Sequence, residues 1–388
     1  MRKNTYPLLI AIGLLCLGLL NSAPAAAEEP AWAYYEENYE IYSPRFSADN
    51  SELTFVRMRH LPDGHEAEMF SDEELNKLLE PIETNPRFAD PEVVLMRLSD
   101  KKARFVDYGW DPAFSEDKSK LYYSRQVTPI SGKRTLAATL AGNEICEYDI
   151  ASQKSTVLAT PSSGFLSDPR PVANGKIIFA LSDATNGAWQ GDVGVGSFDP
   201  KTKKQETLYK PTKEHDLFQL VKRFDMQGEQ CLVLRLRPLT AGTYMADSYA
   251  HELVDAASGK VLYNWGEHPL GNMPPTAFKV CPSGLELYTD SWQFLPAKKS
   301  ASTESPGPGL PSPDCAHVAF AQEQELIVLS SDGRARHWSP RKGLIMSLTW
   351  SPDSSRLAVV ISHGINFDEK FEYDEVIILP LSDKAPGQ

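Results

Sequence analysis

Side chains that could bind a metal or transfer a proton are spread along this sequence and form no compact motif. His60 and His65 lie close together with Glu66 and Glu68 beside them, whereas the other six histidines lie far apart. Imidazole and carboxylate groups are common ligands of transition metals, so a divalent metal held by His60, His65 or His268 is one interpretation. Ordinary surface histidines are the favoured interpretation, and no cofactor is predicted.

Two other kinds of catalytic or metal site find little support. The sequence contains no G-x-S-x-G, the motif that exposes a nucleophilic serine in many hydrolases. The acidic stretch INFDEKFEYDE at residues 365–375 lacks the glycine and the ligand spacing of a calcium-binding loop. These patterns favour a protein that binds a partner over one that catalyses a reaction.

A repeated pattern determines how such residues are positioned. An aromatic residue, a Ser-x-Asp turn and an alternating apolar strand follow one another in FSADNSELTF (46–55), FSEDKSKLYY (114–123) and WSPDSSRLAVV (350–360). This order is typical of a β-hairpin. Seven hairpin openings occur, most of them about 40 to 70 residues apart, which indicates a repeat.

Most of these hairpins precede a second pair of strands, so each unit has four strands. Such units bury their faces only by stacking in a ring, and the predicted fold is an all-β propeller of four-stranded antiparallel blades. Seven blades are favoured and six remain possible, because the unit that begins at Thr276 lacks a clear second hairpin. The last unit ends after three strands at residues 374–381. We expect the aromatic segment 31–42 to supply its outer strand and close the ring.

The Phe/Trp-Ser-x-Asp phrases resemble the repeats of the TolB-like β-propeller superfamily, which is related in shape to WD-repeat proteins. The resemblance covers nearly all of the chain after residue 27 and implies the propeller fold. Members of the superfamily include periplasmic components of the cell-envelope Tol system, oligogalacturonate lyases and the propellers of prolyl oligopeptidases. The lyases imply the alternative function, a metal-dependent polysaccharide lyase or hydrolase. We expect no separate domain ahead of the propeller, as TolB has, and no hydrolase domain after it.

Residues 1–27 have the character of a cleaved signal peptide. Arg2 and Lys3 precede an apolar run and a small-residue tail that ends at Ala27. We therefore expect a periplasmic or secreted protein with no membrane span, in which residues 28–388 form one propeller domain and a monomeric ring. Without Arg2 and Lys3, 37 basic residues face 52 acidic ones, a net charge of −15, which argues against binding to nucleic acid.

Cysteine pairing is left open by the sequence. Four cysteines follow the signal peptide, and an oxidising compartment permits disulfides. Cys281 and Cys315 are the better candidates, because both occur at hairpin turns of neighbouring units. Separate buried thiols are the alternative.

Long insertions indicate where a partner would bind. In a four-stranded blade, the loop between the second and third strands lies on the same face as the connection to the next blade. We assign to this class the segments 58–91, 126–143, 183–191, 238–250 and 362–373. A rigid scaffold that gathers long loops on one face is typical of a recognition surface.

On the same face of the ring, a helical insertion and particular aromatic residues are candidates for binding. The first insertion contains a capping box at residues 71–74 and apolar residues at helical spacing, which predicts a short helical insertion near residues 60–90. A Pro/Ser/Gly-rich loop is expected near residues 298–310. Exposed loop aromatics suit contacts with a protein or a glycan, and the tentative binding residues are Trp110, Phe165, Trp189, Tyr244 and Phe371. The predicted function is a non-catalytic scaffold of the cell envelope that binds an envelope protein or an extracellular polymer.

Overall fold

The computed structural model describes most strands of the chain and part of its loops. The described residues are 32–37, 39–59, 82–84, 91–125, 132–134, 143–161, 165–172, 174–182, 192–211, 215–226, 229–238, 248–269, 278–279, 285–288, 291–294, 309–322, 324–340, 342–363 and 373–381. Across these ranges the regular structure is entirely β. None of it forms a helix of the length and apolarity that a bilayer crossing requires.

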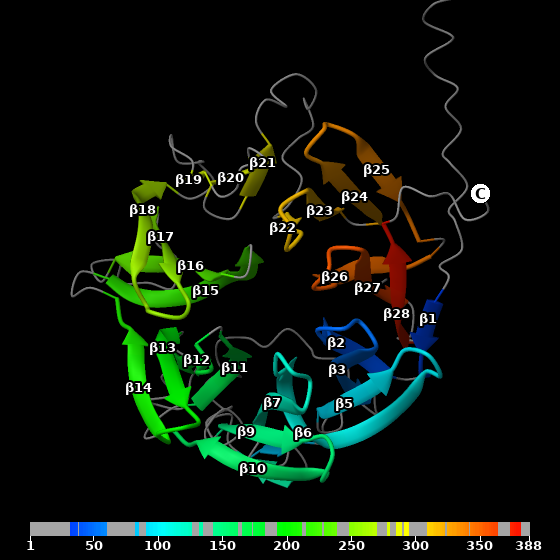
Figure 1. The fold of residues 1–388 in the computed structure, drawn as a ribbon, viewed down its shortest axis with the longest axis horizontal. Helices are drawn as coiled ribbons and strands as arrows, with labels where there is room; N and C mark the ends of the chain where they lie inside the picture. Colours follow the sequence, from blue (N-terminus) through cyan, green and yellow to red (C-terminus); the bar gives the residue numbers. More distant parts are fainter. Residues whose placement is uncertain are drawn as a thin grey trace, which may run out of the picture.

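Four antiparallel sheets contain four strands each, as the alternating apolar pattern predicts (Figure 1). In order from the centre of the ring outwards, they are β11 (Phe165–Pro171), β12 (Ile177–Ser182), β13 (Asp192–Asp199) and β14 (Lys204–Tyr209); β15 (His215–Met226), β16 (Glu229–Pro238), β17 (Ser248–Asp255) and β18 (Val261–Pro269); β22 (Leu310–Pro311), β23 (His317–Gln322), β24 (Glu325–Ser330) and β25 (Ala335–Trp338); and β26 (Leu344–Trp350), β27 (Arg356–His363), β28 (Tyr373–Pro380) and β1 (Trp32–Tyr35).

Two further sheets complete the ring of Figure 1, and a short strand pair stands apart. A sheet of seven strands contains β2 (Tyr39–Phe46), β3 (Glu52–Arg59), β5 (Glu92–Arg97), β6 (Lys102–Phe114), β7 (Lys120–Arg125), β9 (Glu144–Asp149) and β10 (Lys154–Ala159). A sheet of three strands contains β19 (Phe278–Lys279), β20 (Leu285–Tyr288) and β21 (Ser291–Phe294). The strand pair consists of β4 (Ile82–Thr84) and β8 (Gly132–Arg134).

The seven-stranded sheet arises because β6 belongs to two groups of strands. Its first half pairs with β5, and its second half pairs with β7. Gly109 lies where the pairing changes, and a Cβ atom on it would lie 2.3 Å from the backbone oxygen of Ser124. Only glycine permits this close approach.

The hydrophobic core lies between neighbouring sheets, because each sheet is apolar on both faces. Phe55 and Met96 of the β2–β3–β5 group pack against Val360 and Val376 of the sheet that contains β1. Equivalent apolar clusters occur at four other places around the ring. The first joins β5 to β7 and β9, and the second joins the β7–β10 strands to the β11 sheet. The third joins the β11 sheet to the β15 sheet, and the fourth joins the β22 sheet to the β26 sheet. Stacking around a ring thus replaces a single central core.

Trp350 packs between two blades, as its place in the repeat predicts. It lies in the cluster that joins the β22 and β26 sheets, and its indole Nε1–H donates a hydrogen bond of 2.9 Å to the backbone oxygen of Leu310. The repeated aromatic residue therefore fastens a hairpin to its neighbour.

The N-terminal strand β1 pairs with β28 and forms the fourth strand of that sheet. Trp32 lies opposite Ile378, and Tyr35 lies opposite Glu375. The Trp32 indole also donates a hydrogen bond of 2.9 Å to the backbone oxygen of Leu98. The two ends of the described chain therefore meet at one seam, between the β26 sheet and the strands β2, β3 and β5.

The Ser-x-Asp turns have one repeated hydrogen-bond pattern. In the turn before β27, the Ser351 hydroxyl donates to Asp353 Oδ1 at 2.6 Å, and the Ser355 backbone N–H donates to the same oxygen at 3.0 Å. The Arg356 backbone N–H donates to Ser351 Oγ at 2.9 Å, and Ser354 has a positive φ of 61°. The same serine-to-aspartate bond recurs in Ser47 with Asp49, Ser115 with Asp117, and Ser312 with Asp314.

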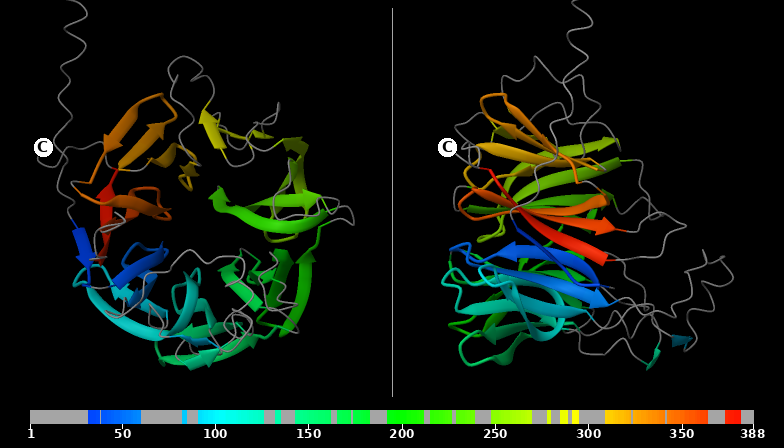
Figure 2. Two further views of the ribbon diagram at one scale, coloured as in Figure 1. Left: turned by 180° about the vertical axis from the view of Figure 1, so that it is seen from behind. Right: turned by 90° about the vertical axis from the view of Figure 1, so that its right-hand side faces the viewer.

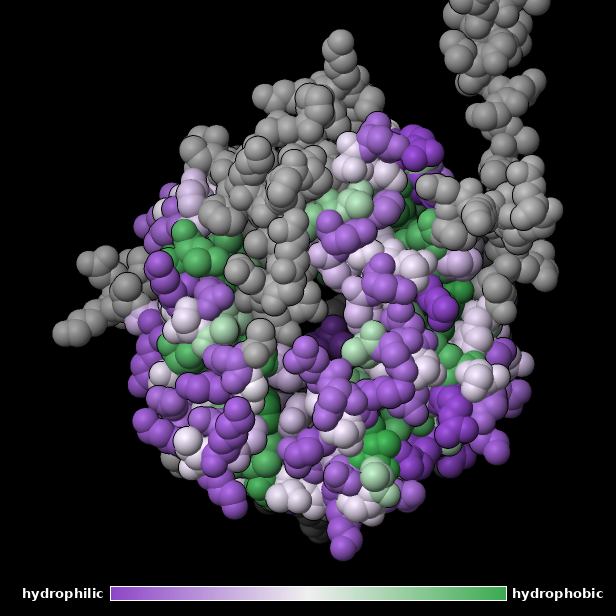
Figure 3. Space-filling model, in the orientation of Figure 1, coloured by the Kyte–Doolittle hydropathy of each residue, from purple (hydrophilic) through white to green (hydrophobic). Residues whose placement is uncertain are grey.

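These turns define one face of the ring, which we call the turn-bearing face. Neighbouring turns touch there: Lys118 forms an ion pair with Asp49, and the Asp314 backbone N–H donates to Ser354 Oγ at 3.0 Å. Figure 3 shows that this face is largely hydrophilic and is hollowed near its centre.

Two of the described cysteines, Cys146 and Cys231, are buried and form no disulfide. Burial raises the pKa of the Cys146 thiol to about 12, so this group is inert at neutral pH. Cys315 is disulfide-bonded, and its partner lies outside the described residues. Its pairing with Cys281 stays a prediction.

Candidate functional site

The long insertions leave the ring on the face opposite the Ser-x-Asp turns, which we call the loop-bearing face. Each insertion joins the second strand of its group to the third, at strand ends that antiparallel pairing places away from the turns. The strands concerned are β3 and β5, β7 and β9, β12 and β13, β16 and β17, and β27 and β28.

Two of these insertions are joined by a strand pair. Residues Ile82–Thr84 of the first insertion form β4, which pairs antiparallel with β8, Gly132–Arg134, of the second. In the edge-on view of Figure 2, β4 and β8 project beyond the ring on the side away from the turns. The predicted helix before Pro81 lies outside the described residues, and the strand β4 was not predicted, because three residues give no recognisable period.

Trp110 is the predicted binding residue whose side chain is best described. It follows Gly109 on β6, is half-buried, and its ring centroid lies 5.9 Å from that of Tyr42 on β2, edge to face. The Tyr42 hydroxyl hydrogen-bonds to the carboxylate of Glu40. An aromatic pair with an acidic neighbour thus joins two innermost strands near the loop-bearing face.

Three neighbouring innermost strands contain the same backbone irregularity. Ser43, Asp111 and Asp168 each precede a proline and have positive φ angles of 50°, 53° and 50°. The strand pairing shifts at each of these positions. Residues other than glycine rarely adopt this conformation, and such strain gathers at functional sites.

Polar side chains at these bulges interact with one another. Ser43 Oγ lies 3.4 Å from Asp111 Oδ1, and Arg170 lies 2.8 Å from Asp168 Oδ1. The sequence signal for the bulges was a Ser-Pro or Asp-Pro pair inside an otherwise regular strand.

A buried carboxylate lies at the seam, at the first residues of β28. Asp374 is 4% exposed, and one carboxylate oxygen accepts a hydrogen bond of 2.9 Å from the backbone N–H of Ile41 on β2. Burial raises the pKa of Asp374 to about 6, although the hydrogen bonds from Ile41 and Ser362 favour the ionised form. Asp374 therefore links the last sheet to the first by a hydrogen bond whose strength depends on its protonation.

Aromatic rings gather next to this carboxylate on the loop-bearing face. The Tyr373 ring lies 4.9 Å from the ring of Tyr35 and 4.6 Å from the ring of His363. Tyr35 is 57% exposed, and His363 Nε2 lies 3.3 Å from Glu375 Oε2. We call Tyr35, His363 and Tyr373 the seam aromatic cluster; it was not predicted, because Tyr35 is distant in sequence from the other two residues.

An ion-pair network supports the same end of the seam. Arg57 lies 2.5 Å from Glu36 and 2.7 Å from Glu92, and its guanidinium stacks over the Tyr39 ring at 4.8 Å. The Tyr34 hydroxyl donates to Glu36 at 2.9 Å. These contacts hold the connection between β1 and β2 in place.

The remaining predicted site residues are not tested. Phe165 is the first residue of β11 and His268 lies near the end of β18, but their side chains are outside the described part of the chain. The other predicted site residues that lie outside it are His60, His65, Trp189, Tyr244 and Phe371. Among the residues that the structure describes, no three His, Cys, Asp or Glu side chains are grouped closely enough to hold a metal ion.

Comparison with solved structures confirms the resemblance at the level of the fold. An oligogalacturonate lyase from Vibrio parahaemolyticus superimposes with a TM-score of 0.51 at 12% sequence identity, over 92% of this chain and 94% of the lyase chain. At this identity the similarity shows the β-propeller fold alone.

Two further propellers are similar at lower scores. TolB from Acinetobacter baumannii has a TM-score of 0.39 and 17% identity over 78% of this chain, which spans 55% of the TolB chain. The β-propeller domain of the Trilobed protease from Pyrococcus furiosus has a TM-score of 0.49 and 12% identity, over 92% of this chain and 97% of that domain. No protein-family model and no curated protein sequence matches the chain.

Proposed function

We propose that this chain is an exported, non-catalytic β-propeller that binds a protein of the cell envelope, or an extracellular polymer, through its loop-bearing face. The observation that carries the proposal is the pairing of β4 with β8, which joins two long insertions into one structure above the ring. Loops held by a rigid scaffold and by one another lose less conformational entropy on binding than independent loops.

Side chains on the same face support the proposal. The seam aromatic cluster offers the exposed ring of Tyr35, and Trp110 with Tyr42 offers an aromatic pair near the centre. Aromatic residues are enriched in binding surfaces because they bury a large area at a small entropic cost. A polar bulge on each of three innermost strands adds further hydrogen-bonding groups.

The proposal includes the architecture and location of the protein. We count seven blades, because β6 serves both as the outer strand of the first group and as the inner strand of the second. The pairing of β1 with β28 supports a ring that its N-terminal strand closes. A cleaved signal peptide at residues 1–27 would deliver this ring to the periplasm or outside the cell.

Deleting residues 63–83 tests the assigned face. The deletion removes most of the first insertion and two of the three residues of β4, so the pairing with β8 is lost. We expect the ring to stay folded, with an unchanged circular dichroism spectrum, and to retain much less of its partner in a pull-down from envelope extract.

A matched change on the opposite face serves as the control. Replacing Asp332 and Arg334 by serine alters an exposed turn on the turn-bearing face and should leave partner capture unchanged. If the deletion variant captures as much partner as the unaltered chain, the loop-bearing face is not the binding surface.

A further inference from the structure

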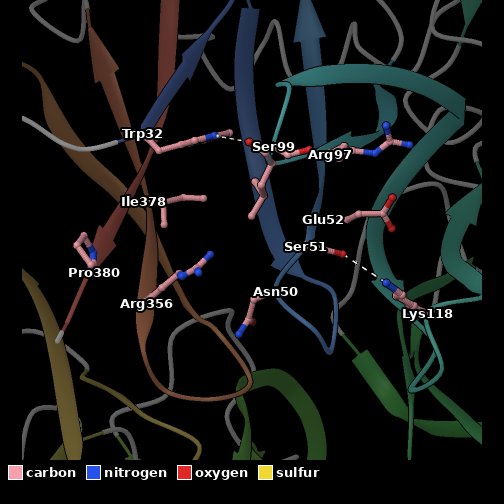
Figure 4. A pocket seen from close by; sticks show the side chains of 11 residues that line it. Trp32, Asn50, Ser51, Glu52, Arg97, Ser99, Lys118, Arg356, Ile378 and Pro380 are labelled. Carbon is pink, nitrogen blue, oxygen red and sulfur yellow. Dashed lines mark hydrogen bonds between the residues drawn. The ribbon is translucent and has the colours of Figure 1, made fainter.

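A groove on the turn-bearing face lies at the seam, away from the loop-bearing face. It has a volume of about 760 Å³, within the range of small-molecule sites. Its walls come from β1, β27 and β28 on one side, and from the turns that follow β2, β5 and β6 on the other (Figure 4). Because chain segments far apart in sequence meet here, the groove exists only in the closed seam.

The lining of the groove is basic although the whole chain is acidic. Arg97, Lys118 and Arg356 line it, against one carboxylate, Glu52, whereas the full sequence has a net charge of −13. Aspartates beside the groove reduce this excess, because Asp100 lies 3.4 Å from Arg97 and Asp49 forms an ion pair with Lys118. The net positive charge of the groove therefore depends on the third of these cations.

Arg356 is that cation. It is exposed at the start of β27, and no carboxylate forms an ion pair with its side chain among the residues that the structure describes. Figure 4 shows its guanidinium extending into the space between Ile378 and Asn50. A guanidinium in this position is suited to a charge-assisted hydrogen bond with a carboxylate.

The other wall groups define what else the ligand would carry. Ile378 and Pro380 lie on the same side as Arg356 and offer an apolar surface, and the Trp32 indole lies at one end. Asn50 also lines the groove, and its side chain forms a hydrogen bond with Asp353.

We propose that this groove binds a small organic acid, with its carboxylate on Arg356 and its apolar body against Ile378 and Pro380. The site is distinct from the loop-bearing face. It does not depend on the proposed partner binding, so either can fail without the other.

Binding of 4-hydroxybenzoate, measured by calorimetry on the full mature chain, tests the site. This probe has the carboxylate and an apolar ring, and a rigid fragment of this size is expected to bind in the millimolar range. We expect Arg356→Gln to weaken binding about tenfold or more, the loss expected from one charge-assisted hydrogen bond. Arg334→Gln, an exposed arginine on the same face but outside the groove, should bind as the unaltered chain does.

Two further probes test the contributions of the carboxylate and of the apolar ring to binding separately. The neutral 4-hydroxybenzamide should bind at least tenfold more weakly than the acid, since it cannot form an ion pair with Arg356. Inorganic phosphate, which has charge but no apolar body, should also bind more weakly. The proposal would be overturned if the Arg356→Gln variant bound 4-hydroxybenzoate as tightly as the unaltered chain does, or if phosphate bound as tightly as 4-hydroxybenzoate. It would also be overturned if 4-hydroxybenzoate did not bind, or if an acidic peptide such as tetraglutamate bound in its place. Unchanged melting temperatures of both variants would show that the loss is not due to unfolding.

Discussion

Aspartates of the Ser-x-Asp turns act on stability through local hydrogen bonds. Partial burial alone would raise the pKa of Asp353, but hydrogen bonds from Ser351 and Ser355 outweigh it and lower the pKa to about 2. The pKa of Asp49 is lowered mainly by its bond with Lys118, and that of Asp117 mainly by its bond with Ser115. The ionised form of these groups is therefore the one that the fold stabilises.

Replacing Asp353 by alanine should lower the free energy of unfolding by about 1 kcal/mol at neutral pH, a modest value because the side chain is solvent-exposed. A carboxylate with a depressed pKa contributes stability above its ordinary value of 3.8, and this stability is lost as the pH falls toward 2. The difference between the variant and the unaltered chain should therefore shrink in acid. Urea unfolding at pH 7 and pH 2.5 measures it, and a difference that is equal at both values would contradict the role given to the carboxylate.

Asp374 should have the opposite pH dependence. Its pKa is raised from 3.8 to about 6, so the native state holds the proton more tightly than the unfolded state does. The free energy of unfolding should accordingly fall as the pH rises from about 4 to about 6, by up to about 3 kcal/mol. In Asp374→Asn this part of the pH dependence should vanish.

The control for this prediction is Asp100→Asn, which changes an exposed aspartate on the turn-bearing face. Thermal unfolding at pH 4, 5, 6 and 7 gives the comparison. A slope that persists between pH 4 and pH 6 in Asp374→Asn would assign it to another group.

At the scale of single elements, β6 shows why a regular repeat can still produce an irregular sheet. One strand serves two groups because its backbone changes direction at Gly109, where it touches the backbone of β7. The repeat spacing predicted two separate hairpins here, each with its own strands. A shared strand depends on close backbone contact between two units, and sequence period carries no information about that contact.

Gly109→Ala should lower the free energy of unfolding by about 1 to 3 kcal/mol, because the added Cβ atom would lie 2.3 Å from the backbone oxygen of Ser124. Gly333→Ala is the matched control: nothing lies within 4 Å of its Cβ position, and its positive φ of 85° should cost only about 1 kcal/mol. Urea unfolding measures both. A Gly109→Ala variant as stable as the unaltered chain would show that the two strands can separate without loss.

At the scale of the whole molecule, the seam between the first and last sheets concentrates the long-range contacts. It contains the pairing of β1 with β28, the bond from Ile41 to Asp374, and the apolar cluster around Phe55 and Val376. The Lys101 ammonium adds a hydrogen bond of 2.7 Å to the backbone oxygen of Ala33. The groove that contains Arg356 depends on the same contacts.

Removing residues 28–37 should therefore weaken the entire ring. It exposes the edge of β28, and an unpaired strand edge favours association with another chain. We expect a lower melting temperature and association that increases with protein concentration, measured by size-exclusion chromatography with light scattering. As a control, a variant that begins at residue 32, and so keeps β1, should be as stable as the longer chain. If the variant that begins at residue 38 is monomeric and equally stable, the seam is not important for the stability of the ring.

The sequence by itself determined the repeated hairpins, the packing of Trp350 between sheets and the face on which the long insertions lie. These features follow from local turn chemistry and from alternation along single strands, which neighbouring residues encode. Only the tertiary structure decided that Asp374 meets Ile41, that Tyr35 and His363 both lie against Tyr373, that β4 pairs with β8, and that Arg356 lines a groove with Asn50. Most of these contacts join residues from different blades or insertions, or from opposite ends of the chain, and their proximity depends on how the sheets are arranged in space.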